Sequence, residues 1–255
     1  MHNNISKNSI VNPKKGLLLP HLKLKGPQQM ALDQILLKKS IASSDFSIAA
    51  RFYTWKGNWL SIGKNQINIP SKWKDLLNQK KINIVRRPSG GKAVLHSGGL
   101  TYALIWKNPP KRKHEAYFAA SQWLLNGFSD LGLPLTFGNQ NLDDFTENCF
   151  SRSTAADLID FDGNKRIGSA QLWQKGHLLQ HGEILLEPPQ ELWLKLFSAP
   201  APKPISIKFT SLELEKVLTK YLLNYWSKTK WEKCNLNEND MDSIKSNSNK
   251  FEYNI

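Results

Sequence analysis

The segment Arg86-Arg87-Pro88-Ser89-Gly90-Gly91-Lys92-Ala93-Val94-Leu95-His96 decides how the rest of the chain is interpreted. Residues 82–85 before it and 100–106 after it have the apolar patterns that are typical of strands. Gly90 and Gly91 carry no Cβ, so a ligand can approach their backbone and their N–H groups. A basic loop with two glycines therefore predicts a cradle for a phosphate or a polar acyl carbonyl. An ordinary basic hairpin is the alternative.

The composition indicates one large folded domain. The chain has 255 residues, of which 40% are hydrophobic and nine are tryptophan. Nothing in it resembles the roughly 18-residue apolar run of a membrane span, and the first 15 residues lack the apolar region of a signal peptide. We therefore predict a cytoplasmic protein that does not enter a membrane, and we expect its two cysteines to be reduced.

The formal net charge of +14 predicts a partner of opposite charge. Nucleic acids, anionic membranes and acidic proteins all satisfy that requirement. The sequence contains no zinc-finger spacing, RNP motif or basic zipper, which makes nucleic acid an unlikely partner and leaves an acidic protein open.

Along the chain, hydrophobic periodicity predicts a flexible arm over 1–20, a folded domain over 21–232 and a disordered tail over 233–255. Within the domain, a strand over 48–55 is expected to pair as a hairpin with 59–63 through the turn at 56–58. Residues 156–186 predict an antiparallel meander, with turn signals at Asp162-Gly163 and Lys175-Gly176. The expected helices cover residues 27–40, 70–79, 117–131, 190–198 and 210–226, the last opened by a capping box of Thr210 and Glu213.

Two residues are candidates for covalent chemistry. Cys149 lies just before the meander, and Lys165 follows its first turn. A lysine beside a cysteine lowers the pKa of the thiol, and it can also donate a hydrogen bond to a thioester carbonyl on which charge builds. The alternative for Cys149 is a small core residue. No spacing of His, Cys, Asp or Glu indicates a metal site.

Small residues on the meander indicate a further contact region. Gly168-Ser169-Ala170 interrupts one expected strand, and such a run admits either close packing or a ligand tail. His181-Gly182 lies on the next strand, in a position that can face it. A structural histidine is the alternative for His181.

With these residues in hand, the chain resembles the lipoate-protein ligase A and octanoyltransferase family. The resemblance extends from about Gln28 to Glu187. Its motifs are Met30-Ala31-Leu32-Asp33, Arg51-Phe52-Tyr53, Leu60-Ser61-Ile62-Gly63, the Arg86–His96 segment, Lys165-Arg166-Ile167-Gly168-Ser169-Ala170-Gln171 and Gln180-His181-Gly182-Glu183-Ile184-Leu185-Leu186. Cys149 ahead of Lys165 is similar to the cysteine-dependent, LipM-type octanoyltransferases. The family usually has Asp after the histidine of the Arg-Arg motif, whereas this chain has Ser97.

The resemblance implies that the folded domain over 21–232 is catalytic. It also implies an α/β fold of the α+β type: a mostly antiparallel mixed sheet with packed helices, as in biotin/lipoate protein ligases. It implies acyl transfer from octanoyl-acyl carrier protein through a Cys149 thioester to a lysine of a lipoyl domain or glycine cleavage H protein, with Lys165 as second catalytic residue and no cofactor. The implied substrate-binding residues are Arg86, Arg87, Ser89, Gly90, Gly91, Ala93, Val94, His96, Gly168, Ser169, Ala170, His181 and Gly182.

Two other functions remain open at this stage. The first is an ATP-dependent lipoate-protein ligase, which would require ATP and Mg²⁺ and would make Cys149 incidental. The second is a non-catalytic module that binds acyl carriers or lipoyl domains without turnover.

Overall fold

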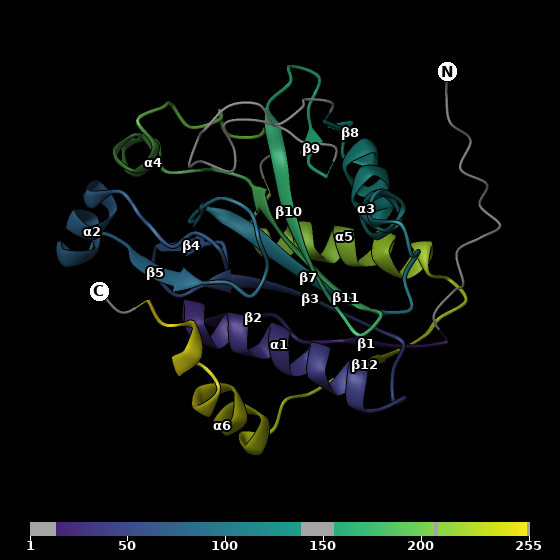
Figure 1. Cartoon of the computed structure of the whole chain (residues 1–255). Helices are drawn as coiled ribbons and strands as arrows, with labels where there is room; N and C mark the ends of the chain where they lie inside the picture. The colour runs from purple at the N-terminus through teal and green to yellow at the C-terminus, as the bar shows by residue number, and fades with distance from the viewer. Residues whose placement is uncertain (1–13, 139–155, 207–208, 254–255) are drawn as a thin grey trace.

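The centre of the molecule is a nine-stranded sheet. The structure is a computed structural model that describes residues 14–138, 156–206 and 209–253. The strands lie in the order β12-β1-β3-β7-β11-β10-β9-β8, and β2 also pairs with β3 (Figure 1). Their bounds are β1 Lys15–Leu18, β2 Leu22–Leu24, β3 Ile48–Trp55, β7 Gly99–Lys107, β8 Thr136–Phe137, β9 Leu158–Ile159, β10 Lys165–Gln174, β11 His177–Leu185 and β12 Lys230–Lys233. Every pairing from β3 to β8 is antiparallel, which confirms the predicted mostly antiparallel mixed sheet.

Helices cover both faces of this sheet (Figure 1). Alternate residues of β3 point to opposite faces, as the pleat requires. Ile48, Ala50 and Phe52 pack in one core with residues of α3 and α5, whereas Ala49 and Tyr53 pack in a second core with α1. The helices are α1 Gly26–Ala42, α2 Ser71–Asn78, α3 Lys113–Asp130, α4 Gln190–Phe197, α5 Ser211–Tyr225 and α6 Glu238–Ser246, followed by the 3₁₀ turn η2 Asn249–Phe251.

A second, three-stranded sheet carries the Arg86–His96 segment. It contains β4 (Trp59–Ile62) between β5 (Asn83–Arg86) and β6 (Val94–His96). The predicted hairpin between residues 48–55 and 59–63 is therefore wrong. After Gly57, which has a φ of 91°, the chain leaves the main sheet, and both edges of β4 are paired within the small sheet. Strand β6 was not expected from the sequence.

The ends of the chain also differ from the expectation. Residues 15–18 of the expected arm form β1, which pairs with β3 and β12. The expected disordered tail contains α6 and η2, whose Ile244 and Phe251 are buried against α1. Widely spaced apolar residues in a polar segment give a weak sequence signal, although Asn237 forms a capping box with Asp240. Among the described residues, no helix combines the length and apolarity needed to cross a membrane.

Candidate active site

A narrow pocket lies where the Arg86–His96 segment meets β10 and β11. Most of the predicted binding residues line it: Arg87, Gly91, Val94, His96, Gly168, Ser169, Ala170, His181 and Gly182. The antiparallel register explains why they meet, because Ala170 pairs with His181 and Ser169 pairs with Gly182. The pocket also contains residues to which the sequence analysis assigned no binding role: Met30, Tyr53, Trp55, Ser61, Thr101 and Glu183.

The glycine loop is held by its own arginine. Arg87 is buried, and its guanidinium donates to the carbonyl of Gly90 at 2.8 Å and to that of Lys92 at 2.6 Å. Its Nη1 donates to the Ser61 carbonyl at 2.9 Å. Gly91, with a φ of 94°, supplies the left-handed conformation of the turn. Arg87 therefore positions the loop, and this guanidinium is already engaged with three carbonyl groups.

The predicted binding residues that do not line the pocket hold the glycine loop or the segments next to it. Nη1 of Arg86 donates to the carbonyls of Gly63 at 3.1 Å and Gln66 at 2.8 Å. Ala93 is buried in the core of the small sheet. Gly90 supplies the carbonyl for Arg87, and Ser89 lies 2.6 Å from His181.

A buried charged cluster forms the α1 side of the site. Arg51 on β3 donates to Oδ1 of Asp33 at 2.9 Å and 2.7 Å, and to Oε1 of Gln29 at 2.7 Å. Burial alone would raise the pKa of Asp33, but the Arg51 charge and the hydrogen bonds hold that pKa below its usual value. Oδ2 of Asp33 lies 3.0 Å from Nδ1 of His181. Asp33 and Gln29 are one turn apart on α1, a spacing that the sequence does show.

A second buried cluster closes the other end of the pocket. Nδ1 of His96 lies 2.7 Å from Oε2 of Glu183, which also accepts a hydrogen bond from Thr101. Nε2 of His96 lies 2.8 Å from Oγ of Ser61, and the ring stacks on Trp55 with 4.0 Å between centroids. Burial lowers the pKa of His96, and the Glu183 charge opposes this effect.

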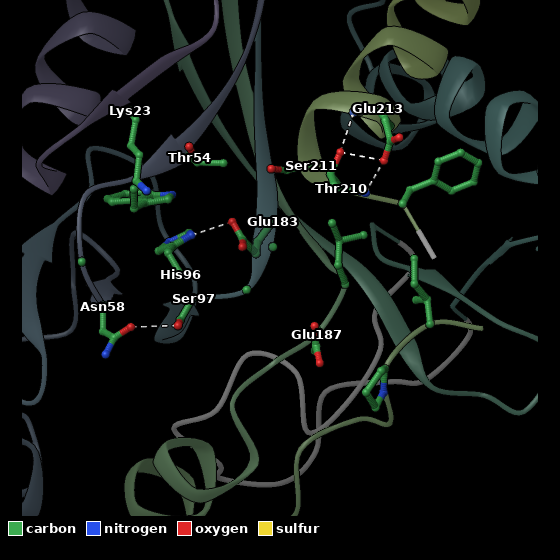
Figure 2. Close-up of a pocket in the computed structure, with 18 residues that line it drawn as sticks. Lys23, Thr54, Asn58, His96, Ser97, Glu183, Glu187, Thr210, Ser211 and Glu213 are labelled. Carbon is green, nitrogen blue, oxygen red and sulfur yellow. Dashed lines mark hydrogen bonds and ion pairs between the residues drawn. The ribbon is translucent and has the colours of Figure 1, made fainter. Parts of the chain in front are cut away.

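This second cluster also borders a larger pocket of about 880 Å³. Trp55, His96 and Glu183 line both pockets. Figure 2 shows His96 facing Glu183, with Ser97 beside Asn58. Ser97, which stands where the family usually has Asp, donates a 2.8 Å hydrogen bond to Oδ1 of Asn58.

Of the two predicted catalytic residues, the structure describes one. Lys165 is buried at the start of β10, and its Nζ lies 2.9 Å from Oδ2 of the buried Asp157. Cys149 lies outside the described residues. On the α3 side of the sheet, Tyr102 and Ser169 hydroxyls lie 2.8 Å apart, and Gln180 donates to the Tyr102 hydroxyl at 2.8 Å. Asp157 and Tyr102 were not singled out from the sequence, whereas Ser169 was a predicted binding residue.

Comparison with known proteins identifies the family. Residues 25–224 match the model of the lipoyl protein ligase A/B catalytic domain. The chain therefore belongs to the lipoyl protein ligase A/B catalytic domain family, as its sequence motifs indicated.

The similar curated proteins are named octanoyltransferase LipM. The protein from Lysinibacillus sphaericus is 36% identical over 186 residues, which cover 66% of this chain and 65% of that protein. The one from Bacillus cereus is 38% identical over 170 residues, or 62% of this chain and 60% of the relative. The chain thus spans about two thirds or less of the length of these relatives.

The similar solved structures share the fold at low identity. A putative lipoate protein ligase from T. acidophilum with bound lipoic acid has a TM-score of 0.75 at 16% identity, covering 91% of this chain and 94% of its own. Lipoate-protein ligase A bound with ATP has a TM-score of 0.74 at 16% identity, covering 93% and 95%. These neighbours confirm the expected biotin/lipoate protein ligase-like fold.

Proposed function

We propose that this protein is an octanoyltransferase of protein lipoylation. The thiolate of Cys149 attacks the carbonyl carbon of octanoyl-acyl carrier protein, the bond from that carbon to the carrier sulfur breaks, and the carrier leaves as its thiolate. The neutral amine of a lysine on a lipoyl domain or glycine cleavage H protein then attacks the acyl-cysteine. An amide forms, and the Cys149 thiol is released. Lys165 donates a hydrogen bond to the acyl carbonyl oxygen as negative charge develops on it.

The observation that carries this proposal is the position of Lys165 on β10. This ammonium group is buried beside Asp157, three residues before Gly168, and β10 contributes Gly168, Ser169 and Ala170 to the pocket wall. A buried lysine is costly unless it is paired, and the ion pair with Asp157 keeps this ammonium at the start of the strand that forms the pocket wall. Membership of the family and the LipM relatives support the same reaction.

The charge of the chain supports the proposed partners. A net charge of +14 favours the approach of acidic proteins, because opposite surface charges raise association rates and select among partners. We propose octanoyl-acyl carrier protein as the donor, and a lipoyl domain or glycine cleavage H protein as the acceptor, all in the cytoplasm.

The ATP-dependent ligase is the competing function, and its support is the fold shared with lipoate-protein ligases. Arg87 donates to three backbone carbonyls and to Oγ of Ser61, and Nη1 of Arg86 donates to backbone carbonyls. Phosphates of ATP would therefore have to find other donors or displace these bonds. This arrangement favours the transferase, for which the proposal includes no cofactor.

Intact-protein mass spectrometry tests the proposal. The purified chain is mixed with octanoyl-acyl carrier protein without ATP, and we expect a mass increase of one octanoyl group. Cys149→Ala should abolish the adduct, whereas the matched variant Cys234→Ala should keep it. Failure of the wild type to form an adduct, with acylation of a lipoyl domain only after octanoate, ATP and Mg²⁺ are added, would establish the ligase instead. Carrier binding without turnover under either condition would indicate the non-catalytic module.

A further inference from the structure

Asp33 lies at one end of a chain of hydrogen bonds that reaches the glycine loop. The residue is completely buried on α1, and its Oδ2 lies 3.0 Å from Nδ1 of His181 on β11. Nε2 of the same ring lies 2.6 Å from Oγ of Ser89. Ser89 directly precedes Gly90 and Gly91. A helix, a central strand and the loop are therefore joined by one imidazole ring.

The groups around Asp33 determine which atom carries the hydrogen in each of these hydrogen bonds. Arg51 donates two hydrogen bonds to the other carboxylate oxygen, so Asp33 stays ionised and can only accept. Nδ1 of His181 then carries the hydrogen that it shares with Asp33. In a neutral imidazole the second nitrogen is an acceptor, and the Ser89 hydroxyl donates to it.

The order carboxylate, imidazole, hydroxyl is that of a serine-hydrolase triad, but the location of Ser89 gives it a different role. The Ser89 residue is 1% exposed and does not line the pocket. Its carbonyl accepts a 2.9 Å hydrogen bond from the backbone of Lys64. Ser89 is thus held at its side chain and at its backbone, which makes it an anchor of the loop and not a nucleophile.

We propose that Asp33 is a positioning residue of the acyl-transfer site, which acts through the tautomer of His181 to hold Ser89 and the Gly90–Gly91 backbone. Because both ring nitrogens are engaged, His181 presents C–H groups to the pocket, which suits an acyl chain. The kinetic part of this inference rests on the proposed octanoyl transfer, whereas the tautomer does not depend on it.

The first test is the tautomer in the wild-type chain. Nitrogen-15 NMR of the histidine rings distinguishes the two neutral forms, and the His181 signals are those lost in His181→Gln. We expect hydrogen on Nδ1 and a bare Nε2. Hydrogen on Nε2, whether alone or together with hydrogen on Nδ1, would overturn the proposal, whether or not the protein transfers octanoyl groups.

The second test separates positioning from general stability. In Asp33→Asn the amide donates to Nδ1, which reverses the tautomer and the direction of the Ser89 bond. We expect kcat for octanoyl transfer to fall about 100-fold with KM unchanged, the size of effect that a shift of reacting groups by about 1 Å produces. The matched control Ser40→Ala removes another buried contact between α1 and a histidine, the one 2.6 Å from Nδ1 of His177, and Ser40 does not line the pocket. It should lower the melting temperature but keep kcat and the tautomer. Equal losses of kcat in both variants would show a structural role only.

A double-mutant cycle with Ser89→Ala completes the test. If Asp33 acts through Ser89, Asp33→Asn lowers kcat much less in the Ser89→Ala background than in the wild type. Full additivity would contradict the proposal. If Asp33→Asn does not fold, the proposal is tested by Ser89→Ala together with the tautomer measurement. An unchanged kcat in Ser89→Ala would overturn the proposal. Absence of octanoyl transfer in the wild type would instead refute the proposed function. The NMR measurement of the His181 tautomer would then be the remaining test of the hydrogen-bond chain.

Discussion

Two buried histidines that border the pocket have the same pattern of hydrogen-bond partners but different electrostatic environments. His181 has Asp33 at Nδ1 and Ser89 at Nε2, at 3.0 Å and 2.6 Å. His96 has Glu183 at Nδ1 and Ser61 at Nε2, at 2.7 Å and 2.8 Å. Each imidazole therefore lies between a carboxylate and a serine hydroxyl.

The carboxylates differ in what balances their charge. Asp33 accepts two hydrogen bonds from Arg51, so its charge is neutralised within the core. Glu183 accepts a hydrogen bond from the neutral hydroxyl of Thr101, in addition to its contact with His96. The comparison teaches that a hydrogen-bond pattern does not determine the energy of a buried group, because the counter-charge sets the cost of removing either partner.

The largest expected effect follows from this difference. Asp33→Asn leaves Arg51 buried without its counter-ion, and we expect a loss of about 3–5 kcal/mol in the free energy of unfolding. Glu183→Gln removes a carboxylate whose hydrogen-bond partners are His96 and Thr101, and should cost about 1–3 kcal/mol. Urea-induced unfolding measures both. Equal losses of unfolding free energy in the two variants would mean that the Arg51 charge does not account for a difference between the two clusters.

A smaller effect is expected at Thr101, which joins Glu183 to Trp55. Its hydroxyl donates to Glu183 and accepts a 2.7 Å hydrogen bond from Nε1 of Trp55. Thr101→Val keeps the shape but leaves two buried polar groups with one partner fewer, at a cost of about 1–3 kcal/mol. The exposed Thr136 provides the control, since Thr136→Val should change stability little. If unfolding curves gave Thr101→Val and Thr136→Val the same stability, a structural role for the Thr101 hydroxyl would be contradicted.

The smallest expected effect is a dependence on pH carried by His96. Its pKa is lowered in the fold below the ordinary value of 6.5, mainly by burial, so the unfolded chain binds this proton more readily. The stability contribution is complete above pH 6.5 and is lost as pH falls through the lower folded pKa. Urea midpoints between pH 8 and about pH 5 should therefore fall less in His96→Gln than in the wild type. If the urea midpoint changed equally with pH in His96→Gln and in the wild type, the pH dependence would come from other groups.

Motif residues were predictable where local sequence controls them. The meander turns at Gly163 and Gly176 have positive φ, and the register they set brings Gly168–Ala170 opposite His181–Gly182. The capping box of Thr210 and Glu213 begins α5 as expected. The pairing of 59–63 was not predictable in the same way, because the partner strand of a short apolar segment depends on distant parts of the chain.

The residue pairs within the site depended on contacts between distant segments. Asp33 was visible in a motif, but nothing in the sequence shows that it lies against Arg51 and His181, 18 and 148 residues away. The same holds for Lys165 and Asp157, since the sequence suggested Cys149 as the partner of that lysine, and Cys149 lies outside the described residues.

The sequence by itself determined many of the strands, helices and turns, because turn residues and hydrophobic periodicity act over short distances. Its motifs indicated the family, and through the family the fold class and the segments that meet at the pocket. Only the tertiary structure decided which buried charges neutralise one another, that Arg87 holds its own loop, and that α6 packs on α1. These outcomes depend on which side chains lose water together, and that is set when distant segments pack.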